Sequence, residues 1–269
     1  MKIAIYTIAK NEEDNIDGWW QSCRDADSIT FCDTGSTDDT KHTMQSVWAN
    51  AGHPNFQFRD ITIAPWRFDF AHNAALALVP ADADLCIPLH LDERLTPGWR
   101  ERIESAYESG AEWVQKYTQR KMPTSLLYPY TYDANTKFMQ NRIHARKGYM
   151  WRYPTHEGPF PYFDTVELQA RVTGDMPLIV QIPPKEGQRE GRGDLKMLEY
   201  GLQEAPGDVH LLWYYGRELM LQKQFAAGAE VLRDLLKHPD TLSTRHHRDA
   251  ARFLAICYHN LGGDSGDVA

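Results

Sequence analysis

The sequence predicts an α/β protein with a doubly wound, mostly parallel, Rossmann-like sheet, followed by a small all-α region of helical hairpins. Three observations carry this prediction. Short apolar runs alternate with helical patterns along the N-terminal part of the chain, which is the order of βαβ units. Polar clusters follow the ends of these runs, where open α/β sheets bind their ligands. After residue 193 the composition shifts to Leu, Tyr and Ala at helical spacing.

The first elements are three strands with two helices between them. Residues 2–8 are apolar and rich in β-branched side chains, which is typical of a central parallel strand. Asn11 is a good helix cap, and the acids after it favour the start of a helix. A second strand over 28–32 leads through a polar turn into a helix over 38–51. With a third strand over 56–63, this order implies a parallel sheet.

The next elements surround an apolar run. A short amphipathic helix is expected over 69–78, with a polar first turn. Residues 85–91 read as a buried strand that ends in an acidic pair and a turn. Pro97 begins another helix, in which Trp99, Ile103 and Tyr107 share one face. Further elements are expected as strands over 112–117 and 137–145, an irregular loop over 121–135, and a last strand within 172–182.

The chain divides into four expected parts. Residues 1–182 form an α/β domain, and the charged, glycine-rich stretch 183–193 is a linker or lid. Residues 194–263 form the helical region, and the tail 264–269 is expected to be disordered. The expected helices of this region are 194–204, 208–223, 224–237 and 244–261.

The bulk composition is that of an ordinary globular protein. The chain has 269 residues, of which 42% are hydrophobic and 25% charged, and its net charge of -8 weakly disfavours nucleic acid or anionic membrane as a partner. Its four cysteines form no CxxC pair, so we expect buried, reduced thiols. The sequence has no apolar run near the roughly 20 residues of a membrane span. We therefore expect a cytoplasmic protein without a membrane span.

The end of the strand over 85–91 is a candidate metal site. His90 and Asp92 are two residues apart, so on a strand both side chains leave the same side. Imidazole and carboxylate together suit Mn²⁺ better than Ca²⁺. The alternative is a solvated strand end that caps the next helix.

Three short motifs resemble a known family. The KNEE element at 10–13, the DTGSTD element at 33–38 and the His-Leu-Asp-Glu element at 90–93 resemble the family 2 glycosyltransferases of the GT-A fold, in order and spacing. The resemblance covers about residues 1–160. The C-terminal helices look like tetratricopeptide-type hairpins, on a pattern of small and large residues. That pattern consists of Trp213, Gly216, Leu219, Phe225, Ala226 and Ala229.

The resemblance implies a nucleotide-sugar donor, most commonly a UDP-sugar. It gives Asn11, Glu12 and Asp33, with Gly35 and Ser36 in the same turn, the task of holding the base and ribose. The pair His72-Asn73 stands where the family favours Arg-Asn and faces the substrate. Arg189 and Arg192 of the glycine-rich stretch would close over the diphosphate. The residues given to the donor are thus Asn11, Glu12, Asp33, Gly35, Ser36, His72, Asn73, Arg189 and Arg192.

The resemblance also implies Mn²⁺ (or Mg²⁺) and an inverting transfer. Asp92 matches the second aspartate of the family's metal motif, His90 replaces the first, and His156 would be a further ligand. Inverting transfer needs a carboxylate that takes the proton of the acceptor. Glu157 is the first choice for this base, with Asp164 as the alternative.

Two other functions compete with this interpretation. The replacements at His90 and His72 favour a catalytically degenerate GT-A domain that acts as a binding or scaffold protein through its helical repeats. A nucleotidyltransferase is disfavoured because residues 9–15 are acidic rather than basic. The acceptor stays open between a glycan, a protein side chain and a modified nucleic-acid base. The C-terminal helices offer a surface for a homodimer.

Overall fold

The computed structural model of the protein describes residues 1–117, 122–132, 136–183, 194–238 and 244–262. The chain separates into two compact units. The first comprises Met1–Arg152 and Gly158–Arg189, and the second comprises Tyr153–Glu157 and Glu190–Ala269. The expected linker and tail lie outside the described residues, apart from residue 183.

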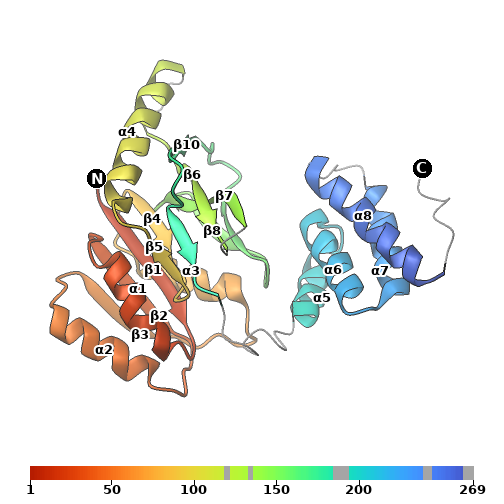
Figure 1. Cartoon of the computed structure of the whole chain (residues 1–269), viewed down its shortest axis with the longest axis horizontal. Helices are drawn as coiled ribbons and strands as arrows, with labels where there is room; N and C mark the ends of the chain where they lie inside the picture. The colour runs from red at the N-terminus through yellow and green to blue at the C-terminus, as the bar shows by residue number, and fades with distance from the viewer. Residues whose placement is uncertain (118–121, 133–135, 184–193, 239–243, 263–269) are drawn as a thin grey trace. The chain divides into compact units, whose positions relative to one another are not determined.

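The first unit is built on a mixed, mostly parallel sheet of nine strands (Figure 1). The strand order is β3-β2-β1-β4-β7-β6-β11-β5, with β10 paired to β6. Strands β1 to β4 are parallel, whereas β7 pairs antiparallel with both β4 and β6. The bounds are β1 Ile3–Ala9, β2 Ser28–Asp33, β3 Phe56–Asp60, β4 Leu85–Pro88, β5 Glu93–Leu95, β6 Ser125–Thr131, β7 Lys137–Ala145, β10 Gln169–Arg171 and β11 Ile179–Gln181.

Helices cover both faces of this sheet. Alternate residues of β1 point to opposite faces, so that Ile3 and Ile5 pack in one cluster, whereas Ala4 and Tyr6 pack in another. The first cluster includes residues of α1 (Ile16–Cys23), α2 (Thr40–Ala51) and α4 (Trp99–Tyr117). The second cluster is covered by α3 (Phe68–Leu78). The helices on both faces make the sheet doubly wound, as predicted.

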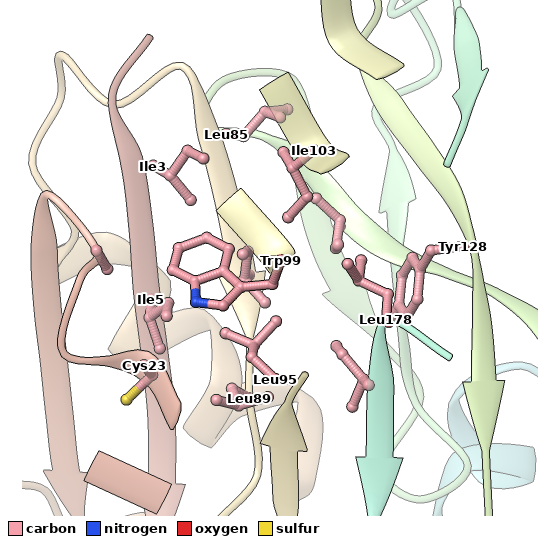
Figure 2. Close-up of a cluster of buried hydrophobic side chains, with 14 of the residues drawn as sticks. Ile3, Ile5, Cys23, Leu85, Leu89, Leu95, Trp99, Ile103, Tyr128 and Leu178 are labelled. Carbon is pink, nitrogen blue, oxygen red and sulfur yellow. The ribbon is translucent and has the colours of Figure 1, made fainter. Parts of the chain in front are cut away.

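The centre of the larger cluster is an indole ring. Trp99 is 4% exposed and lies beside the side chains of Ile3, Ile5 and Leu95 (Figure 2). Ile103 and Tyr107 are buried on the same face of α4, as the spacing predicted. This packing places the first turn of α4 against β1 and β5.

Two predictions for the middle of the chain are wrong. Residues 112–117 continue α4 and are not a strand, because buried residues keep helical spacing through Ala111 and Val114, while Trp113 is 58% exposed. The stretch 121–135, expected as a loop, contains strand β6. Pro129 lies within this strand, where a proline is tolerated beside the irregular register between Leu126 and Tyr128.

A short hairpin follows the sheet strand β7. Strand β8 (Tyr149–Arg152) pairs antiparallel with β9 (Gly158–Pro161), and the register joins Arg152 to Gly158. The five residues between these strands, Tyr153–Glu157, are the segment that belongs to the second unit.

The second unit contains four helices at the predicted places (Figure 1). They are α5 Asp194–Glu204, α6 Val209–Leu221, α7 Phe225–Leu236 and α8 Thr244–Asn260. Asp208 caps α6, because its side chain accepts hydrogen bonds from the amides of His210 and Leu211. The core of α6, α7 and α8 is a separate cluster that includes Leu232, Leu254 and Cys257. All four cysteines of the chain are free and buried, as expected.

Candidate functional site

The site lies at the carboxyl edge of the parallel strands. Strand β1 pairs with β2 on one side and with β4 on the other, so the loops after these three strands meet. Two of these loops are the KNEE and DTGSTD elements. The sequence separates them by about twenty residues, but the sheet makes them neighbours.

The two loops are joined directly by hydrogen bonds. Asn11 has a positive φ of 58°, and its amide donates to Ser36 Oγ at 3.0 Å while its side-chain oxygen accepts from the Thr37 amide at 2.8 Å. The Glu12 amide donates to Thr40 Oγ1 at 2.7 Å. Asn11 therefore is not the helix cap that the sequence predicted. A 3₁₀ turn, Glu13–Asn15, precedes α1 instead, and Asn11 fastens the two loops to each other.

Asp33 organises the second loop from a buried position. Its Oδ1 accepts hydrogen bonds from the amides of Gly35 (2.8 Å) and Ser36 (2.9 Å), and Lys41 Nζ lies 3.4 Å away. Burial by itself raises the pKa of Asp33, but the bonds from Ser36 and Gly35 and the charge of Lys41 hold it below its usual range. Gly35 adopts φ 107°, which a side chain would strain.

Glu12 faces the third loop. Burial raises its pKa, and the Asp92 carboxylate adds to this rise, whereas Asn15 Nδ2 donates to Glu12 Oε2 at 2.7 Å. The electrostatic interaction with His90 lowers the pKa of Glu12 in part. Glu12, which is predicted to bind the nucleotide-sugar, thus lies close to His90 and Asp92, which are predicted to bind the metal.

His90 and Asp92 lie in a turn, which corrects the sequence analysis. Strand β4 ends at Pro88, so the two side chains do not owe their common side to strand periodicity. The turn is fixed by other bonds. Gln181 Nε2 donates to Asp92 Oδ2 at 2.7 Å, and the Ile182 amide donates to the Asp92 carbonyl at 2.6 Å.

Glu93 supports this turn from the core. Its side chain is 1% exposed, accepts from the His90 amide at 2.9 Å and from Tyr130 Oη at 2.9 Å, and is paired with Arg142. Burial by itself raises the pKa of Glu93, but the Arg142 guanidinium holds it below its usual range. The acidic pair of the sequence is therefore divided: Asp92 lies at the site, and Glu93 holds the site in place.

A stack of rings approaches His90 from α3. His72 is 1% exposed, its ring stacks on Trp151 at 3.9 Å between centroids, and it stacks on His90 at 5.3 Å. Burial lowers the pKa of His72 well below 6.5, so the ring is neutral. The first turn of this helix is polar, as expected, but Arg67, Asp69 and His72 are buried there rather than exposed.

A buried network holds Trp151. The indole Nε1 donates to Tyr6 Oη at 2.6 Å, and Tyr6 Oη lies 2.9 Å from His144 Nε2. Sequence reasoning did not identify Tyr6, His144, Trp151 or Arg142 as part of the site. A signal existed for Arg142 and His144, which are polar residues at alternate positions of one strand and therefore face the same side.

Asn73 has a structural contact in this part of the molecule. Its Nδ2 donates to the Trp151 carbonyl at 2.9 Å, and its Oδ1 accepts from the Trp151 amide at 2.8 Å. The side-chain amide thereby clamps β8 to α3. Its predicted contact with the donor stays a prediction.

The remaining predicted residues belong to other segments of the chain. His156 and Glu157 belong to the second unit, where the His156 ring stacks on Tyr214 at 4.0 Å. Asp164 is exposed in a turn after β9. Arg189 and Arg192 are outside the described residues.

Two imidazole rings of the first unit offer nitrogen ligands for a divalent metal. His90 Nε2 is buried and, among the described residues, has no hydrogen-bond partner. One ring nitrogen of His72 and one of His90 lie within 4.8 Å of each other. These two imidazoles are nitrogen donors of the kind that divalent transition metals such as Mn²⁺ take.

The fold class is confirmed by comparison with solved structures. The mixed, mostly parallel, curled sheet followed by α5–α8 has structural neighbours that are glycosyltransferases of the GT-A fold. The crystal structure of S. aureus TarS matches with a TM-score of 0.55 and 11% sequence identity, over 100% of this chain and 54% of that chain. At this identity the likeness is one of fold.

A curated relative points in the same direction. The chain is 28% identical over 165 residues to the lipopolysaccharide core biosynthesis glycosyltransferase LpsC of Rhizobium meliloti (strain 1021). The match covers 60% of this chain and 58% of that protein, so the chain spans less than two thirds of its relative. No protein-family model matches the sequence. The predicted similarity to glycosyltransferases is supported by this relative and by the fold.

Proposed function

We propose that the protein is a metal-dependent, inverting glycosyltransferase that moves a sugar from a nucleoside-diphosphate sugar to an acceptor. One observation carries the proposal. The ends of β1, β2 and β4 bring Glu12, the Asp33 loop and the His90–Asp92 turn to one edge of a GT-A sheet. Within that edge, His90 keeps a buried ring nitrogen without a hydrogen-bond partner among the described residues.

His90 and Asp92 would hold the metal, with Mn²⁺ favoured over Mg²⁺ by the imidazole. When bound, the ion would neutralise the charge that develops on the departing diphosphate. Glu93 and Gln181 keep the turn in one conformation, so the ligand atoms need little rearrangement. His72 limits the rotation of the His90 ring by stacking on it.

The paired loops of Asn11 and Asp33 would bind the nucleoside. Carboxylates and main-chain groups at strand ends accept hydrogen bonds from a base or a ribose. Uridine is the proposed base, as the resemblance implies. Arg189 and Arg192 would close over the diphosphate.

In the transfer step an acceptor hydroxyl attacks the anomeric carbon. The new C–O bond forms as the bond between that carbon and the diphosphate oxygen breaks, and the hydroxyl proton passes to a carboxylate. Glu157 is proposed as this base, with Asp164 as the alternative. Both assignments rest on the family resemblance.

A glycan is the proposed acceptor. The curated relative is named for the synthesis of a lipopolysaccharide core, whereas nothing comparable favours a protein side chain or a nucleic-acid base. Among the described residues, no helix has both the length and the apolar character that a membrane crossing requires. We further propose that α5–α8 are tetratricopeptide-like and that they support a homodimer in the cytoplasm.

A scaffold protein on a degenerate GT-A domain is the second candidate. Two observations favour it: His90 stands in the first metal position, and the amide of Asn73 is bonded to the main chain of Trp151. In a scaffold, neither nucleotide nor metal would bind at the His90–Asp92 turn.

Substitution of Asp92 separates the two candidates. Asp92→Asn keeps an acceptor for Gln181 Nε2 but removes the charge. We expect release of the nucleoside diphosphate from a donor sugar, with acceptor glycans present, to fall by roughly 100-fold or more at an unchanged free energy of unfolding. A variant as active as the wild type would contradict the proposal.

A further inference from the structure

The segment Tyr153–Glu157 has an unusual backbone. Tyr153 has a φ of 79° and His156 a φ of 54°, and neither is a glycine. A bulky residue in the left-handed region is strained and persists only where its surroundings hold it. The contacts that hold this segment are therefore informative.

Helices α5 and α6 supply these contacts within the second unit. The Tyr153 ring stacks on His210 at 4.1 Å, and its hydroxyl donates to Asp208 Oδ2 at 3.3 Å. Thr155 Oγ1 donates to Asp194 Oδ1 at 2.9 Å. His210 Nε2 donates to the main-chain carbonyl of His156 at 3.1 Å.

His156 is bound most extensively. Its ring lies parallel to that of Tyr214, at 4.0 Å between centroids and 9° between planes. Arg217 Nη2 lies 3.3 Å from His156 Nε2, and the same guanidinium is 4.8 Å from the Tyr214 ring centroid and 2.7 Å from Glu218 Oε1. A guanidinium only donates hydrogen bonds, so Nε2 accepts and the ring proton is on Nδ1.

This tautomer matters for the chemistry. A metal needs the lone pair of an imidazole nitrogen, and here the lone pair of Nε2 points at Arg217 while Nδ1 carries the proton. The ring thus uses its unprotonated nitrogen and its stacking face for contacts with α6. Glu157 is the next residue in the chain, so its backbone is held by the contacts of His156.

We propose that His156 is the anchor, and not a metal ligand, that fastens the segment Tyr153–Glu157 to α6, and that Tyr214 and Arg217 are positioning residues for Glu157. The inference rests on the proposed function for the role of Glu157. Within the second unit, α6 fixes the backbone from which the proposed base Glu157 projects.

The substitution His156→Phe tests the anchor against the ligand. Phenylalanine keeps a ring to stack on Tyr214 and removes both nitrogens. We expect the Mn²⁺ concentration for half-maximal transfer to stay within about threefold of the wild-type value, since a removed metal contact typically costs more, about 10- to 100-fold. A rise of tenfold or more would overturn the proposal.

Substitution of Tyr214 tests the positioning role. We expect Tyr214→Ala to lower kcat by roughly 10- to 100-fold, with the KM for the donor changed less than threefold, and Tyr214→Phe to restore kcat. Tyr215→Ala is the matched control, because that half-buried ring of the same helix contacts Glu199 instead. Equal kcat values for Tyr214→Ala and Tyr215→Ala would contradict the role.

Hydrogen exchange gives a readout that does not depend on activity. Tyr214→Ala should speed amide exchange of residues 155–157 at least tenfold, and Tyr215→Ala should not. If no donor supports transfer by the wild type, the proposed function fails, and the exchange experiment then still tests the anchor. Unchanged exchange in Tyr214→Ala would overturn it.

Discussion

Asp92 and Glu93 are adjacent carboxylates with different roles, because one lies at the site and the other is buried beneath it. Asp92 is half-buried at the site edge, whereas Glu93 is buried beneath it and paired with Arg142. Sequence reasoning identified the pair but could not divide it, because the division depends on Arg142 of β7, which is far away in the chain. The same holds for Asn11, whose bonds to a second loop are set by strand pairing.

Glu93→Gln is therefore expected to destabilise the protein. It leaves the Arg142 guanidinium buried without its counter-charge, which typically costs about 3–5 kcal/mol. Urea denaturation of the wild type and the variant measures the free energy of unfolding. Asp92→Asn serves as the control and should stay within about 1 kcal/mol. Equal stabilities for the wild type and Glu93→Gln would show that Arg142 does not depend on this carboxylate.

The buried His144 predicts a pH dependence of stability. Burial lowers its pKa from 6.5 to about 4. Since the folded state favours the neutral ring, the contribution is complete above pH 6.5 and is lost progressively as the pH falls from 6.5 to about 4. This shift corresponds to roughly 3 kcal/mol.

The free energy of unfolding at pH 7 and at pH 4.5 measures this contribution in the wild type and in His144→Gln. We expect the loss of stability between the two values to be smaller in the variant by about 2 kcal/mol. His72, whose pKa is also lowered by burial, is present in both proteins and cancels. An identical loss in both proteins would refute the assignment.

At the scale of elements, local patterns predicted most of the fold. The strands β1, β2 and β4 and all four C-terminal helices were found from hydrophobic periodicity, because each buries a regular face. Errors arose where tertiary packing overrides local preference. The strand expected over 112–117 continues α4, and the loop expected over 121–135 contains β6.

The pairing of α6 with α7 predicts an effect of side-chain size. A Cβ at Gly216 would lie 2.7 Å from Leu232 Cδ2, which is too close for a buried side chain. We expect Gly216→Ala to destabilise the second unit by about 1–3 kcal/mol, less the gain in helix propensity of about 1 kcal/mol. Gly207→Ala is the control, since a Cβ there meets nothing within 4 Å. Thermal unfolding followed by circular dichroism measures both, and a Gly216→Ala protein as stable as this control would contradict the packing.

At the scale of the whole molecule, the chain combines two units with separate cores. The sequence predicted a catalytic sheet followed by helices, but it could not show that Tyr153–Glu157 belongs with the helices. That membership comes from contacts with Asp194, Asp208 and Tyr214, which lie 39 or more residues later in the chain.

The central claim is that a nucleotide and a metal bind together at the His90–Asp92 turn. Thermal unfolding of the full chain with UDP, GDP, CDP and TDP, each with and without Mn²⁺, tests it most directly, because a ligand of the native state stabilises that state by mass action. At a concentration 100 times the Kd, the stabilisation is about 2.7 kcal/mol. We predict that one nucleotide raises Tm only when Mn²⁺ is present, and that Asp92→Asn abolishes this rise. No rise with any nucleotide, or an equal rise without Mn²⁺ and in Asp92→Asn, would contradict the claim.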